Sequence, residues 1–75
     1  MWKWNIDIYL KGCNEPRRCV YTGPETNSGD VMIKLFQGKN PYDWVDLFSA
    51  DKEAVTYVAV GEIASIDIYE RKDKK

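Results

Sequence analysis

The chain has 75 residues, of which 44% are hydrophobic, 13% aromatic and 31% charged, and its formal net charge is −1. Domains usually need about 100–200 residues, so this length predicts one small domain with a small core. The composition is that of a folded protein. It excludes a multidomain enzyme, a chain that is as a whole a disordered acidic or basic tail, a collagen-like chain and a disulfide-dense scaffold. We predict a single β-rich domain over residues 1–70 and a charged C-terminal tail over 71–75.

Apolar and polar side chains alternate strictly over residues 2–10. The apolar positions are Trp2, Trp4, Ile6, Ile8 and Leu10. This pattern predicts a strand with one buried face, which is typical of antiparallel sheets. Turn residues follow, and a hairpin that turns at Pro16 leads to a second strand over 17–22. The inward face of that strand stays open, because Val20 and the pair Cys19/Tyr21 point to opposite sides.

A short helix is predicted after Gly23-Pro24, which breaks the second strand. Asn27, Ser28 or Asp30 is suited to cap its first turn, and Gly38 is suited to follow its last. The apolar stripe of this helix consists of Val31, Met32, Leu35 and Phe36. A helix of about ten residues is unstable alone, so it must pack on the sheet.

Three further strands are predicted, over 42–48, over 54–60 and, after one tight turn, up to Tyr69. In the last strand Ile66 and Ile68 face the core, and Ile63 fills the corner. The predicted fold is mainly β (α+β), with one short helix and the order β-β-α-β-β-β. Its sheet is either a five-stranded curled antiparallel sheet or a small barrel.

Five short, strongly curled strands with a corner turn before the last resemble the SH3-like and Sm-like small barrels over residues 2–70. The chain also resembles a group of short uncharacterised proteins of Gram-positive bacteria and their mobile elements. That likeness rests on the opening alternating strand, on Gly23-Pro24 and on the ending Ile63-Ala64-Ser65-Ile66-Asp67-Ile68. It implies a small bacterial β-rich fold and brings no activity or site residue with it.

The residues for catalysis or metal binding are scarce. The chain has no histidine, which is the commonest general base near neutral pH and the commonest metal ligand. Its two cysteines are too few for a structural zinc site. We therefore predict no enzyme, no catalytic or metal-binding residue and no cofactor. At the N-terminus, polar residues interrupt the apolar stretch that a secretory signal needs, and no apolar run approaches the length of a membrane span. The sequence therefore predicts a cytoplasmic protein without a membrane partner.

Cys13 and Cys19 flank Pro16 at equal spacing. In a hairpin that turns at Pro16 they would stand opposite each other, close enough for a bridge. One hypothesis is therefore a redox pair. The alternative is two reduced cysteines near the end of a hairpin, which the cytoplasm favours.

The aromatic residues are the strongest candidates for partner binding, because Tyr and Trp give a large contact area at little entropic cost. Periodicity places Trp2, Trp4 and Phe36 in the core. The candidate partner-binding residues are Tyr9, Tyr21, Trp44, Phe48 and Tyr69. Trp44 and Phe48 share one face of their strand, and they reach the surface if Val45 and Leu47 face inward. The alternative is that the helix covers them.

The net charge of the predicted domain limits the kind of partner that it can bind. Residues 71–75 carry +3, which leaves −4 on residues 1–70 and argues against binding to phosphates. The most favoured function is a small non-catalytic protein-interaction module, an adaptor or a self-associating domain, that uses an edge strand and surface aromatics. The alternative is an Sm-like or SH3-like nucleic-acid-binding domain on which Tyr9, Tyr21 and Tyr69 stack bases.

Overall fold

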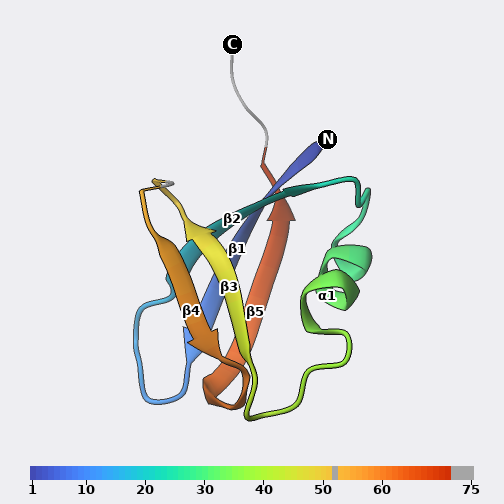
Figure 1. Cartoon of the computed structure of the whole chain (residues 1–75). Coiled ribbons are helices and arrows are strands. Elements are labelled where there is room, and N and C mark those ends of the chain that lie inside the picture. The colour runs from blue at the N-terminus through green and yellow to red at the C-terminus, as the bar shows by residue number, and fades with distance from the viewer. Residues whose placement is uncertain (52, 72–75) are drawn as a thin grey trace.

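A computed structural model describes residues 1–51 and 53–71 of the chain (Figure 1). The elements are β1 (Trp2–Leu10), β2 (Arg17–Gly23), α1 (Ser28–Phe36), β3 (Trp44–Ser49), β4 (Val55–Ala59), the 3-10 helix η1 (Val60–Glu62) and β5 (Ile63–Glu70). The predicted mainly β fold and the order β-β-α-β-β-β are confirmed. Of the predicted charged tail, residues 72–75 lie outside the described residues, and the amide of Arg71 continues β5 by donating to the carbonyl of Lys3 (2.9 Å).

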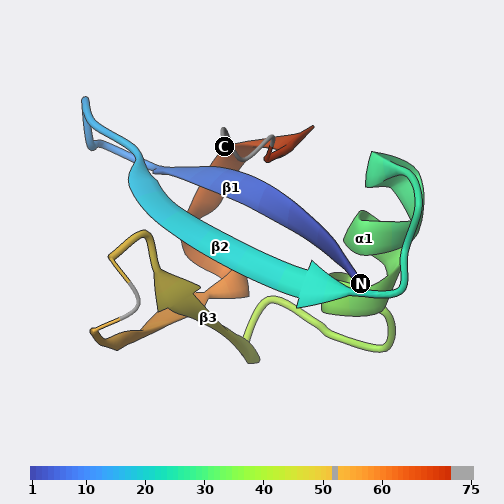
Figure 2. The ribbon, with the colours of Figure 1, turned by 90° about the horizontal axis from the view of Figure 1, so that it is seen from above.

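All strands belong to one antiparallel sheet in the order β4-β3-β2-β1-β5. Its edge strands are β4 and β5, which do not pair with each other in the described part of the chain. Of the two predicted forms, the sheet is therefore the curled, unclosed one. Figure 2 shows β1 and β2 side by side, with α1 standing at one side of the curl.

The core lies on the inner face of the curled sheet. Its buried members are Trp4, Ile6, Ile8, Cys19, Val31, Leu35, Val45, Leu47 and Val58. The alternation predicted for β1 is confirmed at Trp4, Ile6 and Ile8, but the prediction for Trp2 is wrong, since 45% of this side chain is exposed. Trp2 lies at the end of β1 opposite Gly23, which offers no side chain for the indole to pack against.

The inward faces of β2 and β3 are now defined. Cys19 lies opposite Ile6 and faces the core, whereas Val20 lies on the outer face, where the neighbouring strands on both sides bury it. In β3 the core side chains are Val45 and Leu47. Cys19 and Val20 of β2 are both buried, because neighbouring strands also cover the outer face of the central strand of a sheet.

Helix α1 begins and ends as predicted. The side chain of Asn27 accepts a hydrogen bond from the amide of Asp30 (2.9 Å), and Gly38 takes the positive φ of 76° that suits a residue after a helix. Val31 and Leu35 insert into the core, and α1 packs against β5. Met32 is 41% exposed, although the predicted stripe includes it. No helix in the described residues is long and apolar enough to cross a membrane.

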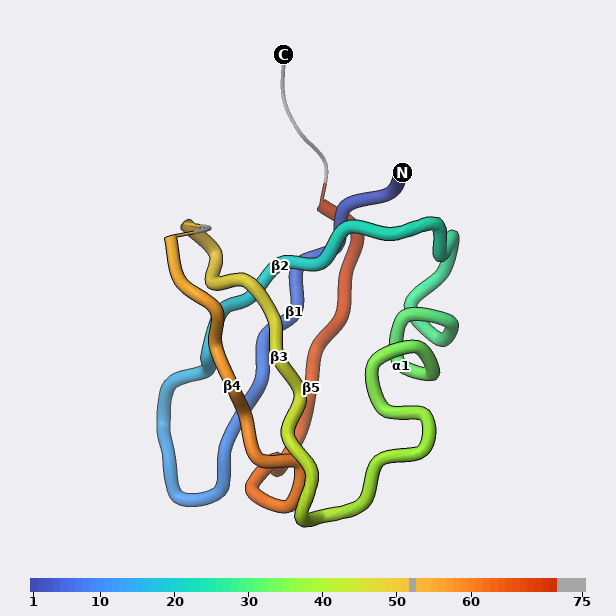
Figure 3. Tube along the Cα trace, viewed as in Figure 1, coloured from blue at the N-terminus to red at the C-terminus, as the bar shows by residue number. Residues whose placement is uncertain are grey.

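The predicted corner before the last strand is the 3-10 helix η1. Figure 3 follows the chain from β4 through this turn into β5. The amide of Val60 donates to the carbonyl of Asp43, and the amide of Lys11 donates to the carbonyl of Glu62 (both 2.9 Å). Ile63 is half-buried against the core, so it fills the corner as predicted.

Candidate partner-binding surface

The outer face of the β3–β4 hairpin carries a cluster of exposed apolar side chains. Its members are Trp44 (58% exposed), Phe48 (58%), Val55 (43%) and Tyr57 (66%), and we call them the aromatic surface. Because Val45 and Leu47 point into the core, the alternation of β3 turns Trp44 and Phe48 outward. The hypothesis that they lie at the surface is confirmed, and the alternative that α1 covers them is wrong.

A cleft opens beside this surface. Strands β2 and β3 pair at Cys19/Ser49 and at Val20/Phe48, and then they part. The cleft between them has a volume of about 350 Å³ and is lined by Val20, Tyr21, Thr22, Asp46, Leu47 and Phe48. A smaller hollow of about 70 Å³ lies between Phe48 and Val55. The aromatic surface therefore has a recess next to it.

The hairpin around the aromatic surface is acidic. Residues 43–53 contain four carboxylates and one lysine, for a net charge of −3. Asp43 accepts a hydrogen bond from the amide of Asn40 (2.9 Å). The hydroxyl of Ser49 and the amide of Glu53 donate to Asp51 and lower the pKa of its carboxyl group. The carboxylate of Asp46, between Trp44 and Phe48 on the same outer face, makes no hydrogen bond or ion pair with a side chain or loop amide of the described residues.

Tyr9 and Tyr69 lie on the outer face too, but at the other side of the sheet. The hydroxyl of Tyr69 donates to Oδ2 of the buried Asp7 (3.2 Å). Partial burial and the neighbouring carboxylate raise the pKa of Tyr69, so its hydroxyl keeps the proton that it donates. Tyr9 is half-buried opposite Ser65. Strands β1 and β2 separate Tyr69 from the aromatic surface, so the predicted aromatic residues do not form one site.

Tyr21 borders the cleft, yet its side chain belongs to the inner face. It lies opposite Trp4, and its hydroxyl donates to Oε1 of Glu25 (2.8 Å). Burial and this hydrogen bond raise the pKa of Tyr21. The indole Nε1 of Trp4 donates to the carbonyl of the same Glu25 (3.2 Å). Through these two hydrogen bonds, Trp4 and Tyr21 hold Glu25 in place, and with it the connection between β2 and α1.

Sequence reasoning missed Val55 and Tyr57, which complete the aromatic surface. Val55 lies opposite Phe48, and Tyr57 lies opposite Asp46. The alternation of β4 contains the signal, since Val55 and Tyr57 share one face of the strand while Thr56 and Val58 share the other. Both faces carry apolar side chains, so the pattern alone does not say which one is buried.

The two cysteines do not stand opposite each other, so that part of the redox hypothesis is wrong. The hairpin turns at Gly12 (φ 76°), where the amide of Cys13 donates to the carbonyl of Leu10 (3.1 Å), and not at Pro16. Cys13 is exposed in this turn, whereas Cys19 is buried opposite Ile6, and both thiols are free. The strand from Ile6 to Leu10 alone spans about 13 Å, beyond the reach of a disulfide.

We expect the two thiols to differ in reactivity. Burial raises the pKa of the Cys19 thiol, and the thiolate is the reactive form. In the folded protein, iodoacetamide will therefore modify Cys13 first and Cys19 only after addition of guanidinium chloride. Mass spectrometry of the labelled chain checks this order. Equal labelling of both cysteines under native conditions would contradict the burial of Cys19.

Comparison of the chain with protein-family models, with curated proteins and with solved structures found no match in any of the three. The resemblance to short proteins of Gram-positive bacteria and their mobile elements therefore stays a prediction.

Proposed function

We propose that this chain is a small non-catalytic protein-interaction module that binds a partner protein through the aromatic surface. The observation that carries the proposal is the exposure of Trp44, Phe48, Val55 and Tyr57 side by side on one hairpin. Contiguous exposed apolar clusters mark interaction sites in folded proteins, and Trp and Tyr are enriched where binding energy concentrates. The cleft next to Phe48 offers a recess for one side chain of the partner.

The charge around the surface favours a protein over a nucleic acid. Nucleic acids need Lys and Arg beside the stacking aromatics, because each phosphate carries a negative charge. Here Asp46 lies within the aromatic surface, and residues 43–53 carry −3. Arg18 lies on the same outer face, two residues before Val20, the partner of Phe48, but it is a single cation beside the −3 of residues 43–53. A basic or neutral protein surface is the complementary partner.

The proposed module is of the SH3-like kind. The support is the curled five-stranded sheet together with η1, the corner turn that leads directly into β5. Small barrels and curled sheets of this kind host many unrelated roles, so the class alone does not assign a partner.

Affinity capture with matched variants tests the function. The native domain and the double variant Trp44→Ser/Tyr57→Ser serve as baits in lysates of the cells that make the chain. The control is Ile33→Ser/Tyr42→Ser, which removes two side chains that are 59% and 91% exposed outside the surface. We expect the native and control baits to retain a common protein, and the Trp44/Tyr57 variant to retain at least tenfold less.

Three outcomes would overturn the proposal. The first is equal retention by the native bait and the Trp44/Tyr57 variant, and the second is retention of no protein by the native bait. The third is an oligonucleotide that binds the native domain with a steep salt dependence and loses affinity in the Trp44/Tyr57 variant, which would establish the nucleic-acid alternative.

A further inference from the structure

The outer edge of β5 presents backbone hydrogen-bonding groups to the surroundings. In an antiparallel pair, the N–H and C=O of one residue point to the same side of the strand, and the side alternates along the chain. The amide of Arg71 donates to β1 (2.9 Å), so residues 65, 67 and 69 also point to β1. Ile66 and Ile68 therefore direct their backbone groups away from β1, where no described strand pairs with them.

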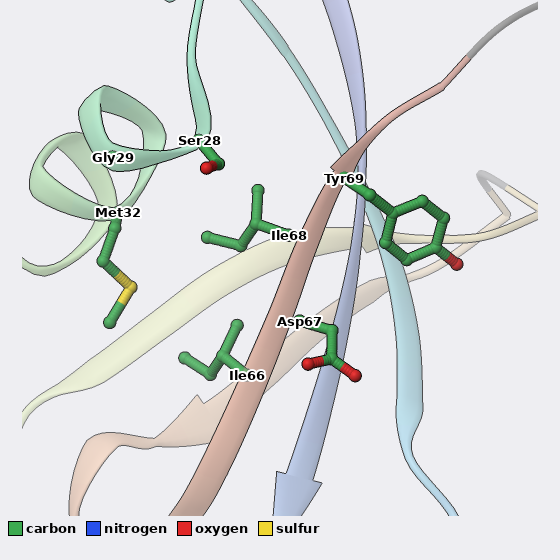
Figure 4. Close-up of a pocket in the computed structure, with 7 residues that line it drawn as sticks. All are labelled: Ser28, Gly29, Met32, Ile66, Asp67, Ile68 and Tyr69. Atoms are coloured by element: carbon green, nitrogen blue, oxygen red, sulfur yellow. The ribbon is translucent and has the colours of Figure 1, made fainter.

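A groove of about 490 Å³ runs between this edge and α1 (Figure 4). Ile66 and Ile68 point towards Met32 and Ser28 of the helix, while Asp67 and Tyr69 point to the other side of the strand. Both isoleucines are half-buried, and Met32 is 41% exposed. The apolar side chains of an added strand would thus meet Ile66 and Ile68 of β5 and Met32 of the helix.

The outer face of the same edge has an unbalanced charge. Arg18, Asp7 and Asp67 form one row across β2, β1 and β5, in that order. Two carboxylates lie directly opposite each other in this row, which destabilises a sheet. Arg18 lies beside Asp7, so Asp67 ends the row without a cation next to it. The next position in the row belongs to whatever strand pairs with β5.

We propose that the free edge of β5 binds an extended basic segment of a partner protein, which adds a strand to the sheet. The segment places an Arg or Lys opposite Asp67 and apolar side chains over Ile66 and Ile68, against Met32. Main-chain hydrogen bonds to Ile66 and Ile68 provide affinity, and the alternate side chains provide specificity. This docking site is independent of the aromatic surface and stands even if that surface binds nothing.

A second copy of the chain fits the edge less well. The strands with a free edge are β4, with the sequence VTYVA, and β5, with the sequence IASIDIYE. Neither strand contains a lysine or an arginine within its bounds, and Arg71, which continues β5, reaches Asp67 of an adjacent chain only in the one antiparallel register that sets these two residues opposite each other. The charge of −4 on residues 1–70 favours a basic segment.

Amide hydrogen exchange with two model peptides tests the site. The probes are nine-residue peptides, acetylated and amidated, that alternate valine with arginine in one case and valine with glutamate in the other. With the arginine peptide, we expect exchange at Ile66 and Ile68 to slow at least tenfold, and exchange at Asp67, whose amide already faces β1, to change less. The glutamate peptide should leave all three rates unchanged.

Two matched variants and one modified peptide separate the contributions. Asp67→Asn should weaken binding of the arginine peptide about threefold, as expected for the loss of an exposed ion pair. Glu15→Gln removes an exposed carboxylate from the connection between β1 and β2, outside both surfaces, and should leave the affinity unchanged. Methylation of the backbone nitrogens along the edge of the peptide that faces β5 should abolish binding, because it removes the donors that pair with β5.

Three results would overturn the proposal. One is equal binding of the two peptides, and another is protection that lies away from β5. The third is protection of Ile66 and Ile68 that rises with protein concentration and without peptide, since it would show that a second copy occupies the edge. Binding at β5 with no effect of Trp44→Ser/Tyr57→Ser would support this site and leave the aromatic surface to its own test.

Discussion

Ile6→Asp is expected to leave the chain unfolded at room temperature. The side chain of Ile6 is 0% exposed, and it lies in the middle of the core with Cys19 on one side and Ile68 on the other. An aspartate there would bury a carboxylate without a partner, which costs several kcal/mol. Folded domains are stable by only about 5–15 kcal/mol, and this one is small. The expected result is collapse of the amide dispersion in an NMR spectrum.

The control makes the same change at an exposed isoleucine. Ile33 of α1 is 59% exposed, so Ile33→Asp keeps its carboxylate in water and should preserve the native spectrum. A dispersed spectrum from Ile6→Asp would contradict the inner face of β1, and with it the placement of the whole core. Loss of structure in both variants would mean that α1 buries the face that carries Ile33.

Trp4→Ala is expected to lower the melting temperature by about 20 °C. Trp4 is 5% exposed, and its indole Nε1 donates to the carbonyl of Glu25 (3.2 Å). Truncation of a buried Trp costs about 3–5 kcal/mol through lost burial and the cavity left behind. In a domain of this size each kcal/mol shifts the melting temperature by about 4–8 °C. The change also releases the connection to α1, so the helix signal in circular dichroism should fall at a lower temperature.

Trp44→Ala is the matched control, because it removes the same side chain from a position that is 58% exposed. We expect its melting temperature to stay within a few degrees of the native value. A drop as large as that of Trp4→Ala would place Trp44 in the core and would remove the basis of the aromatic surface. A small drop leaves Trp44 free to contribute to binding, which the affinity capture then measures.

Local patterns along the chain are enough to predict the order of the elements and several of their ends. The alternation over residues 2–10 predicts β1, because period-two burial depends only on the chain direction of a strand. Asn27 and Gly38 predict the limits of α1, since a cap and a positive φ are satisfied locally. The absence of histidine likewise restricts the chemistry without any knowledge of the fold.

The inward faces, the cysteine positions and the free sheet edge depend on neighbouring strands, so they follow only from the packed fold. Apolar residues on both faces of β3 and β4 left two choices, and only packing into the common core put Val45 inside and Trp44 outside. The turn at Gly12 instead of Pro16 separated the two cysteines, because pairing along the whole of β1 fixes where the hairpin reverses. The free edge of β5 follows from strand order, and strand order arises from long-range pairing that no local pattern encodes.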